Sequence, residues 1–314
     1  MTDRNALKRG ALATLTLYLL IALTFFVPFV SLLSIWLIPL PIMFLAAKDG
    51  WKSALAIIGI GFIFLVILDQ SFYILLPVFF MILGFALGYM IQLKKSAFAL
   101  LLAGSLTNIA VLIIYLAISV LIFHFNPVSA AQSALNQSLQ QTLTQMQPML
   151  EQDTGEIMDL YKSQMDNLMY LTPMILITVG VLYALLVELI SLPILRLIKL
   201  EVPRWVPFRM WQVPRSVIWC YLAVVFIGWF GAEQGTPLYT VVLNLELILE
   251  MLLAIQGFSL MFYYSHLKKF PVIVPITLTI LAVLFGYLLL QLVRILGIID
   301  LGFNLRKRLN QKKS

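Results

Sequence analysis

The sequence holds little of what most catalytic and metal-binding sites require. Its 314 residues include one cysteine, Cys220, and two histidines, His124 and His266, which lie far apart near the ends of apolar runs. A single cysteine excludes an internal disulfide and a cysteine-based zinc or iron–sulfur site. The phosphate-cradling glycine loop, the HExxH motif and the Cys-x-x-Cys motif are all missing. We therefore expect no enzyme, no catalytic residues, no metal site and no cofactor.

Charge is also scarce. Charged residues make up 11% of the chain and hydrophobic residues 62%, with a mean hydropathy of +1.00. The apolar residues form unbroken runs, and about 20 of them suffice to cross a bilayer. This predicts an all-α, polytopic integral membrane helix bundle with about eight to ten transmembrane segments. The predicted spans are 11–30, 32–47, 53–68, 71–92, 97–125, 171–195, 217–230 and 238–264, followed by one long apolar region, 272–305.

Glycines in the apolar runs predict one helix contact and one turn. The pair Gly84 and Gly88 has the small-xxx-small spacing that lets helices approach closely, and it suggests a packing contact. The region 272–305 is about 50 Å long as one helix, too long for a simple crossing. We expect a helical hairpin or re-entrant turn near Gly286 that returns the tail to the cytoplasm.

The basic surplus orients the chain. There are 21 lysines and arginines against 14 acidic residues, a net charge of +7. Basic residues favour cytoplasmic loops, so we expect a multi-pass protein of the bacterial cell membrane with its N-terminus inside. The lipid bilayer is then the first partner. The sequence lacks the basic face of a folded soluble domain, so no nucleic-acid partner is expected.

Composition divides the chain into four parts. Residues 1–125 form a five-span half. Residues 126–170 are rich in Gln, Ser and Asp with apolar residues at helical intervals, which predicts an extracytoplasmic insert of amphipathic helices. Residues 171–305 form a second membrane half, and 306–314 a basic cytoplasmic tail.

Carboxylates inside the spans are the main candidate ligands. Glu246 and Glu250 are one helical turn apart and share a face, and Glu188 lies in another span. A charge at membrane depth costs about 2.5–3.5 kcal/mol, which favours a polar cavity that binds a cation or an amine-bearing substrate. The structural alternative is an ion pair, with Arg294 as the obvious partner. Asn108 could face the same interior or simply tie helices together.

The loop 203–215 contains three prolines and a cluster of arginines and tryptophans. Arg204, Trp205, Arg209 and Trp211 could dock a cytoplasmic or membrane protein partner. The simpler interpretation is an anchor in the headgroup layer, where tryptophan is favoured.

Several short stretches resemble known families. Ile38-Pro39-Leu40-Pro41, Lys48-Asp49-Gly50 and Gly59-Ile60-Gly61 look like the second and third helices of the substrate-binding S components of energy-coupling-factor transporters. Over the full length the chain resembles the YybS-like family, bacterial membrane proteins of unknown function grouped distantly with those S components. The residues that carry this second match are Gln256-Gly257-Phe258-Ser259, Leu296-Gly297-Ile298-Ile299-Asp300 and Asn304-Leu305-Arg306-Lys307-Arg308.

These resemblances imply a function. An S-component-like five-span half, 1–125, implies transport-associated binding of a small molecule in an intramembrane cavity, here lined by Glu246 and Glu250. The insert 126–170 and the C-terminal spans depart from the six-helix S-component plan. The cell-shape protein MreD is a further similarity, and it implies the alternative of a membrane scaffold that organises envelope or signalling proteins.

Overall fold

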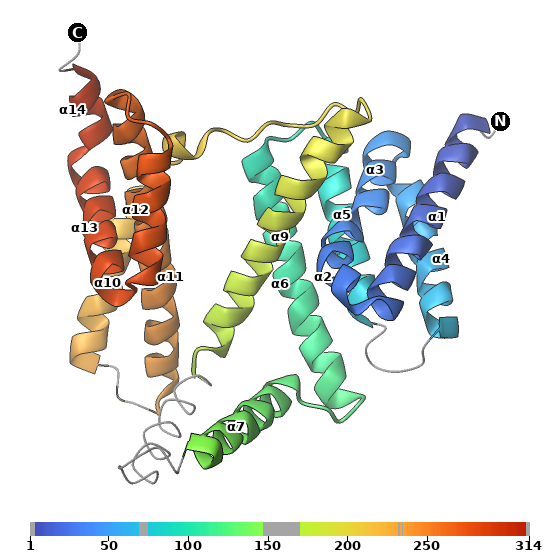
Figure 1. Ribbon diagram of the computed structural model, residues 1–314, viewed down its shortest axis with the longest axis horizontal. Helices are drawn as coiled ribbons and strands as arrows, with labels where there is room; N and C mark the ends of the chain where they lie inside the picture. The colour runs from blue at the N-terminus through green and yellow to red at the C-terminus, as the bar shows by residue number, and fades with distance from the viewer. Residues whose placement is uncertain (1–3, 69–74, 147–169, 232, 234, 312–314) are drawn as a thin grey trace. The chain divides into compact units, whose positions relative to one another are not determined.

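The computed structural model describes residues 4–68, 75–146, 170–231, 233 and 235–311 (Figure 1). Every regular element among them is a helix, which confirms the predicted all-α class. The chain forms two compact units. Unit 1 comprises Met1–Met165 and Ile175–Trp205, and unit 2 comprises Asp166–Met174 and Val206–Ser314. The division by composition into four parts describes the expected path of the chain through the membrane, and it remains a prediction. These parts are 1–125, 126–170, 171–305 and 306–314.

Unit 1 is built from seven helices and most of an eighth among its described residues. Each membrane helix overlaps a predicted span, but the first helix begins at Arg4 where the predicted span begins at residue 11, and the span 32–47 is interrupted at Ile38. Pro39 follows this residue, and proline lacks the N–H that would continue the helical ladder. The helices are α1 (Arg4–Phe26), α2 (Pro28–Leu37), α3 (Pro39–Asp49), α4 (Trp51–Leu68), α5 (Leu75–Gln92), α6 (Ala97–Leu121), α7 (Pro127–Met146) and α9 (Thr172–Leu197), whose first three residues belong to unit 2.

Helices α3 and α5 touch backbone to backbone. A Cβ atom added at Gly84 would lie 2.4 Å from the Pro39 carbonyl oxygen, and one added at Gly88 would lie 2.4 Å from that of Met43. Only glycine permits this approach, so the packing contact expected from the small-xxx-small spacing is confirmed. The contact is part of the main apolar core of unit 1, which also contains Leu87.

Polar residues gather at one end of unit 1. Arg9 at the start of α1 forms an ion pair with Asp49 at the end of α3. Lys94, after α5, lies 4.0 Å from Glu201, after α9, and both side chains are largely exposed. The first predicted helix of the insert is present as α7, whereas the second falls within 147–169, outside the described residues.

Unit 2 is a bundle around one long helix, α11. Its described elements are a 3-10 turn (Phe208–Met210), α10 (Ser216–Gly231), α11 (Pro237–Leu267), α12 (Ile273–Leu284), α13 (Tyr287–Phe303) and α14 (Leu305–Gln311). The chain turns between α12 and α13 at Gly286, whose φ of 59° suits glycine. Figure 1 shows α12 running back along α11 and α13 returning beside it, which confirms the turn expected near Gly286.

Helices α11 and α13 run in the same direction and almost touch. A Cβ atom added at Gly257 would lie 2.0 Å from the Val293 carbonyl oxygen, and one added at Gly297 would lie 2.0 Å from that of Leu253. Each helix therefore offers a glycine to the other's backbone. The close approach fixes the register that brings polar side chains of the two helices together.

The helices have the dimensions and surfaces of membrane spans. Within the described ranges, five helices are long and apolar enough to cross a membrane, by length and composition, when α2 and α3 are taken together: Arg4–Phe26, Phe29–Asp49, Ala97–Leu121, Thr172–Leu197 and Pro237–Leu267. Helices α4, α5, α10 and α12 are shorter and apolar. Large apolar side chains such as Phe29 (89% exposed) and Trp229 (80%) point outwards, a surface suited to lipid.

Candidate functional site

Three charged side chains of unit 2 meet where α10, α11 and α13 pack. Glu250 on α11 forms an ion pair with Arg294 on α13, and the two side chains are 20% and 11% exposed. The Tyr221 hydroxyl of α10 donates a hydrogen bond to Glu250. Glu246, one turn earlier on α11, lies within electrostatic range of both Glu250 and Arg294. When all three are ionised, Glu246, Glu250 and Arg294 together carry one more negative than positive charge.

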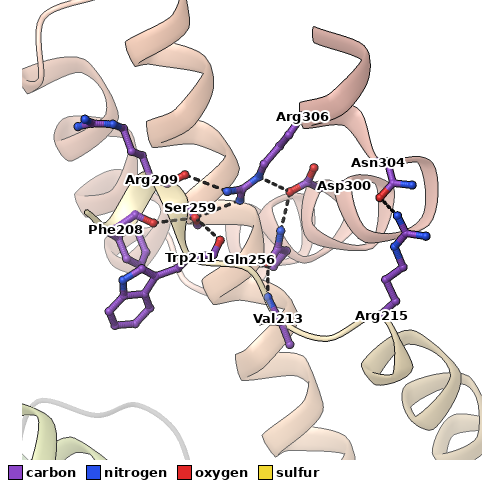
Figure 2. A network of polar contacts seen from close by, with 10 residues as sticks. All are labelled: Phe208, Arg209, Trp211, Val213, Arg215, Gln256, Ser259, Asp300, Asn304 and Arg306. Atoms are coloured by element: carbon purple, nitrogen blue, oxygen red, sulfur yellow. Dashed lines mark hydrogen bonds and ion pairs between the residues drawn. The ribbon is translucent and has the colours of Figure 1, made fainter. Parts of the chain in front are cut away.

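A second polar cluster lies one to two turns further along the same helices (Figure 2). The Gln256 amide Nε2 donates to Asp300 Oδ2 over 2.5 Å, and Arg306 Nε donates to the same oxygen over 2.9 Å. All three residues are buried, because Gln256 is 1% exposed, Asp300 4% and Arg306 6%. The carboxylate and the guanidinium therefore compensate each other at a largely buried position.

The same cluster holds the loop 206–215 against the helices. Arg306 donates to the Arg209 carbonyl over 2.9 Å and to Ser259 Oγ over 3.0 Å. The Ser259 hydroxyl lies 2.8 Å from the carbonyl oxygens of Phe208 and Trp211, and its single proton can serve one of them at a time. Arg306 and Ser259 thus supply side-chain donors to the Arg209 and Trp211 carbonyls of this irregular segment, while the Phe208 carbonyl also accepts the Trp211 N–H.

A pocket of about 280 Å³ opens beside this cluster. Gln256, one of its lining residues, also accepts the Val213 N–H through Oε1 over 2.9 Å. At the mouth, Arg215 contacts the side chain of Asn304, which links α13 to α14 in a left-handed backbone conformation. The pocket is lined by Gln212, Val213, Arg215, Gln256, Asp300, Leu301, Asn304, Arg306 and Lys307.

Glu188 occupies a different environment, inside unit 1. It lies on α9 and is 0% exposed, among the apolar core residues Ala184, Val187 and Leu192. Neither of its carboxyl oxygens has a hydrogen-bond partner among the described residues, and the same holds for the Ser191 hydroxyl one turn later. A buried carboxyl group without a partner calls for a specific explanation, because native structures satisfy nearly all such groups.

Asn108 has a plain packing contact. Its side-chain amide donates to the Gly180 carbonyl over 3.1 Å and ties α6 to α9, and the residue is 4% exposed. Asn244 of unit 2 makes a comparable tie, since it accepts the Met174 N–H over 2.8 Å and donates to the Tyr170 carbonyl. Interhelical bonds of this kind contribute about 0.6 kcal/mol on average in membranes.

Of the four candidate docking residues, Trp205 and Trp211 make side-chain contacts with their own chain. Trp205 packs on the apolar core of unit 1, and the Trp211 indole N–H donates to the Val206 carbonyl over 3.0 Å. The Arg209 carbonyl is held by Arg306, whereas Arg204 is exposed. The two aromatic side chains therefore serve local packing in this structure.

Sequence reasoning did not single out Gln256, Ser259, Asp300 and Arg306 as site residues. A signal was present, because Asp300 is an acidic residue within an apolar run and Arg306 follows it closely, although six residues is not the spacing of a pair on one helix. Their meeting with α11 depends on the register set by Gly257 and Gly297, which spacing along the chain does not reveal. Among the described residues, no group of three His, Cys, Asp or Glu side chains is placed to hold a metal ion.

The fold and these sites define a multi-pass helical membrane protein with buried polar clusters. The chain belongs to the family described as "Predicted membrane protein (DUF2232)", which it matches over residues 14–301. It is 28% identical to "Uncharacterized protein YybS" of Bacillus subtilis (strain 168) over 316 residues, covering 98% of this chain and 99% of the relative. The resemblance to the YybS-like family is thereby confirmed. No solved structure matches the chain.

Proposed function

We propose that the chain binds a small cationic or amine-bearing molecule within the membrane, as part of a transport process. The observation that carries this proposal is Glu188, a carboxyl group fully buried in unit 1 with no hydrogen-bond partner among the described residues. An ionisable group inside a membrane segment is a functional candidate by default. Its burial costs free energy, so such groups are rare unless they have a function. A bound cation or amine supplies the missing partner.

The charged residues Glu246 and Glu250 on α11, with Arg294 on α13, form the second candidate site for the same ligand. Glu250 already has Arg294 as its partner, so the uncompensated charge of that group rests with Glu246. A cationic ligand at Glu246 would bring the group to neutrality. The proposal thus retains carboxylates as the ligand-binding residues and gives Glu188 first place.

The proposed role is binding and not catalysis, in the bacterial cell membrane with the N-terminus inside. The clustering of Arg9, Lys94 and their acidic partners at one end of unit 1 supports this orientation, because basic residues favour the cytoplasmic side.

The test compares Glu188→Gln with Glu201→Gln. Both changes remove one carboxylate and keep the side-chain size, but Glu201 is 94% exposed and outside the core. We expect native mass spectrometry of the purified protein to show a non-lipid adduct of constant mass in the wild type and in Glu201→Gln. The adduct should be lost in Glu188→Gln, although this variant unfolds at the same temperature. An adduct retained in Glu188→Gln, or no adduct in any form, would remove the basis of the proposal.

The scaffold alternative predicts a different pattern in cells. In a complementation assay, a scaffold should tolerate Glu188→Gln and Glu246→Gln, whereas changes in 203–215 or 126–170 should abolish function. The binding proposal predicts the reverse.

A further inference from the structure

The pocket beside Arg306 has a charge that the proposed carboxylate site does not use. Its lining holds three cationic side chains, Arg215, Arg306 and Lys307, and one carboxylate, Asp300. Arg306 donates directly to Asp300, so these two charges compensate each other. Arg215 and Lys307 are exposed at the mouth, and neither is paired with a carboxylate within the described part of the chain. The pocket therefore presents two positive charges without a counter-ion.

The neutral lining adds donors that are already oriented. The Gln256 side chain is fixed at both ends, because its oxygen accepts the Val213 N–H and its nitrogen donates to Asp300. Asn304 contacts Arg215 and holds that guanidinium near the opening (Figure 2). A pocket whose walls are fixed in this way loses little side-chain entropy when a ligand enters.

The position of the pocket narrows the ligand class. Its lining joins the C-terminal end of α13 to residues 212–215, and Trp211, just before these residues, packs edge to face with Phe208. Tryptophan is enriched at the level of lipid headgroups. Basic pockets between membrane helices bind anionic headgroups, and guanidinium and ammonium groups both bind phosphate well.

We propose that this pocket binds a phosphate ester, with Arg215 and Lys307 as its ion-pairing groups and the Gln256–Asp300–Arg306 network as its fixed floor. Its volume of about 280 Å³ suits a group the size of a lipid headgroup. The phosphate can belong to an anionic phospholipid or to a small soluble phosphate ester, and the chemistry of recognition is the same.

The test uses two double variants of the full chain. Arg215→Gln/Lys307→Gln removes the two charges at the mouth, and Lys268→Gln/Arg308→Gln removes one lysine and one arginine that are exposed outside the pocket. Protein in mild detergent is titrated with phosphatidylglycerol, with phosphatidylcholine and, separately, with glycerol phosphate, and bound species are counted by native mass spectrometry. Circular dichroism checks that both variants remain folded.

We expect the pocket variant to weaken binding of the preferred phosphate ester about tenfold to thirtyfold, as two lost charges imply. The control variant should weaken it less than about threefold. Selective retention of phosphatidylglycerol identifies a lipid headgroup as the ligand, and saturable binding of glycerol phosphate identifies a soluble ester. Equal losses in the two variants, or no binding of either compound above that of phosphatidylcholine, would overturn the proposal.

Discussion

The contact between α11 and α13 makes a sharp prediction about Gly297. In Gly297→Ala the new methyl carbon would lie 2.0 Å from the Leu253 carbonyl oxygen, whereas ordinary contacts begin at 3.4 Å. The helices must therefore separate by 3.4 − 2.0 = 1.4 Å at this point. Overpacking of this kind costs about 1–3 kcal/mol, and the separation also weakens neighbouring contacts, since dispersion falls steeply with distance.

Gly302, on the same helix, is a control that distinguishes the steric cost of an added methyl group from the change in helix propensity. A Cβ atom at Gly302 meets nothing within 4 Å. Replacing a helical glycine with alanine stabilises by about 0.5–1 kcal/mol when the space is open, so Gly302→Ala should be neutral or more stable than the wild type. The propensity gain is common to both variants. The difference between them should thus equal the steric cost of about 1–3 kcal/mol.

The measurement is unfolding of each purified variant in detergent, followed by tryptophan fluorescence. Gly297→Ala should unfold at a lower temperature or denaturant concentration than the wild type, and Gly302→Ala at an equal or higher one. If Gly297→Ala is as stable as Gly302→Ala, the close approach of the two helices is not present in the molecule and the reasoning fails.

Two further predictions concern the buried charge pairs. Asp300→Asn leaves the Arg306 guanidinium buried without its counter-charge and should cost about 3–5 kcal/mol, whereas adding Arg306→Gln should recover part of that loss; thermal unfolding of the single and double variants measures both, and a double variant less stable than Asp300→Asn would contradict the assignment. For the pair in the membrane, a double-mutant cycle of Glu250→Gln and Arg294→Gln should give a coupling free energy of about 0.5–3 kcal/mol, while additive effects would mean that the ion pair contributes nothing.

Much of the fold follows from local sequence, because hydrophobic length is a local property. The predicted spans 97–125, 171–195 and 238–264 correspond to α6, α9 and α11, whose ends differ from the predictions by a few residues. The turn at Gly286 was predictable for the same reason, since a single helix over the whole apolar region is longer than a bilayer is thick. The division into two compact units was not predictable, because it depends on which helices pack together.

For the candidate sites too, the sequence predicted what lies on one helix but not which helices pack together. The i, i+4 spacing placed Glu246 and Glu250 on one face, and Arg294 lies against Glu250 in the structure. By contrast, Gln256 and Asp300 are 44 residues apart and meet only because α11 and α13 are parallel in a particular register. A polar residue in an apolar run signals that a partner exists, but the identity of that partner is a property of tertiary packing.

The hairpin of α12 and α13 has a consequence for how the chain enters the membrane. Helix α12 has 12 residues and is about 18 Å long, well short of the hydrocarbon core. Because the chain turns back at Gly286, the start of α12 and the end of α13 lie at the same end of unit 2 (Figure 1). This segment can be inserted after the long helix α11 without carrying a hydrophilic stretch to the far side. The basic residues of α14 then stay on the same side as Lys268 and Lys269 after α11, so their charge need not cross the bilayer.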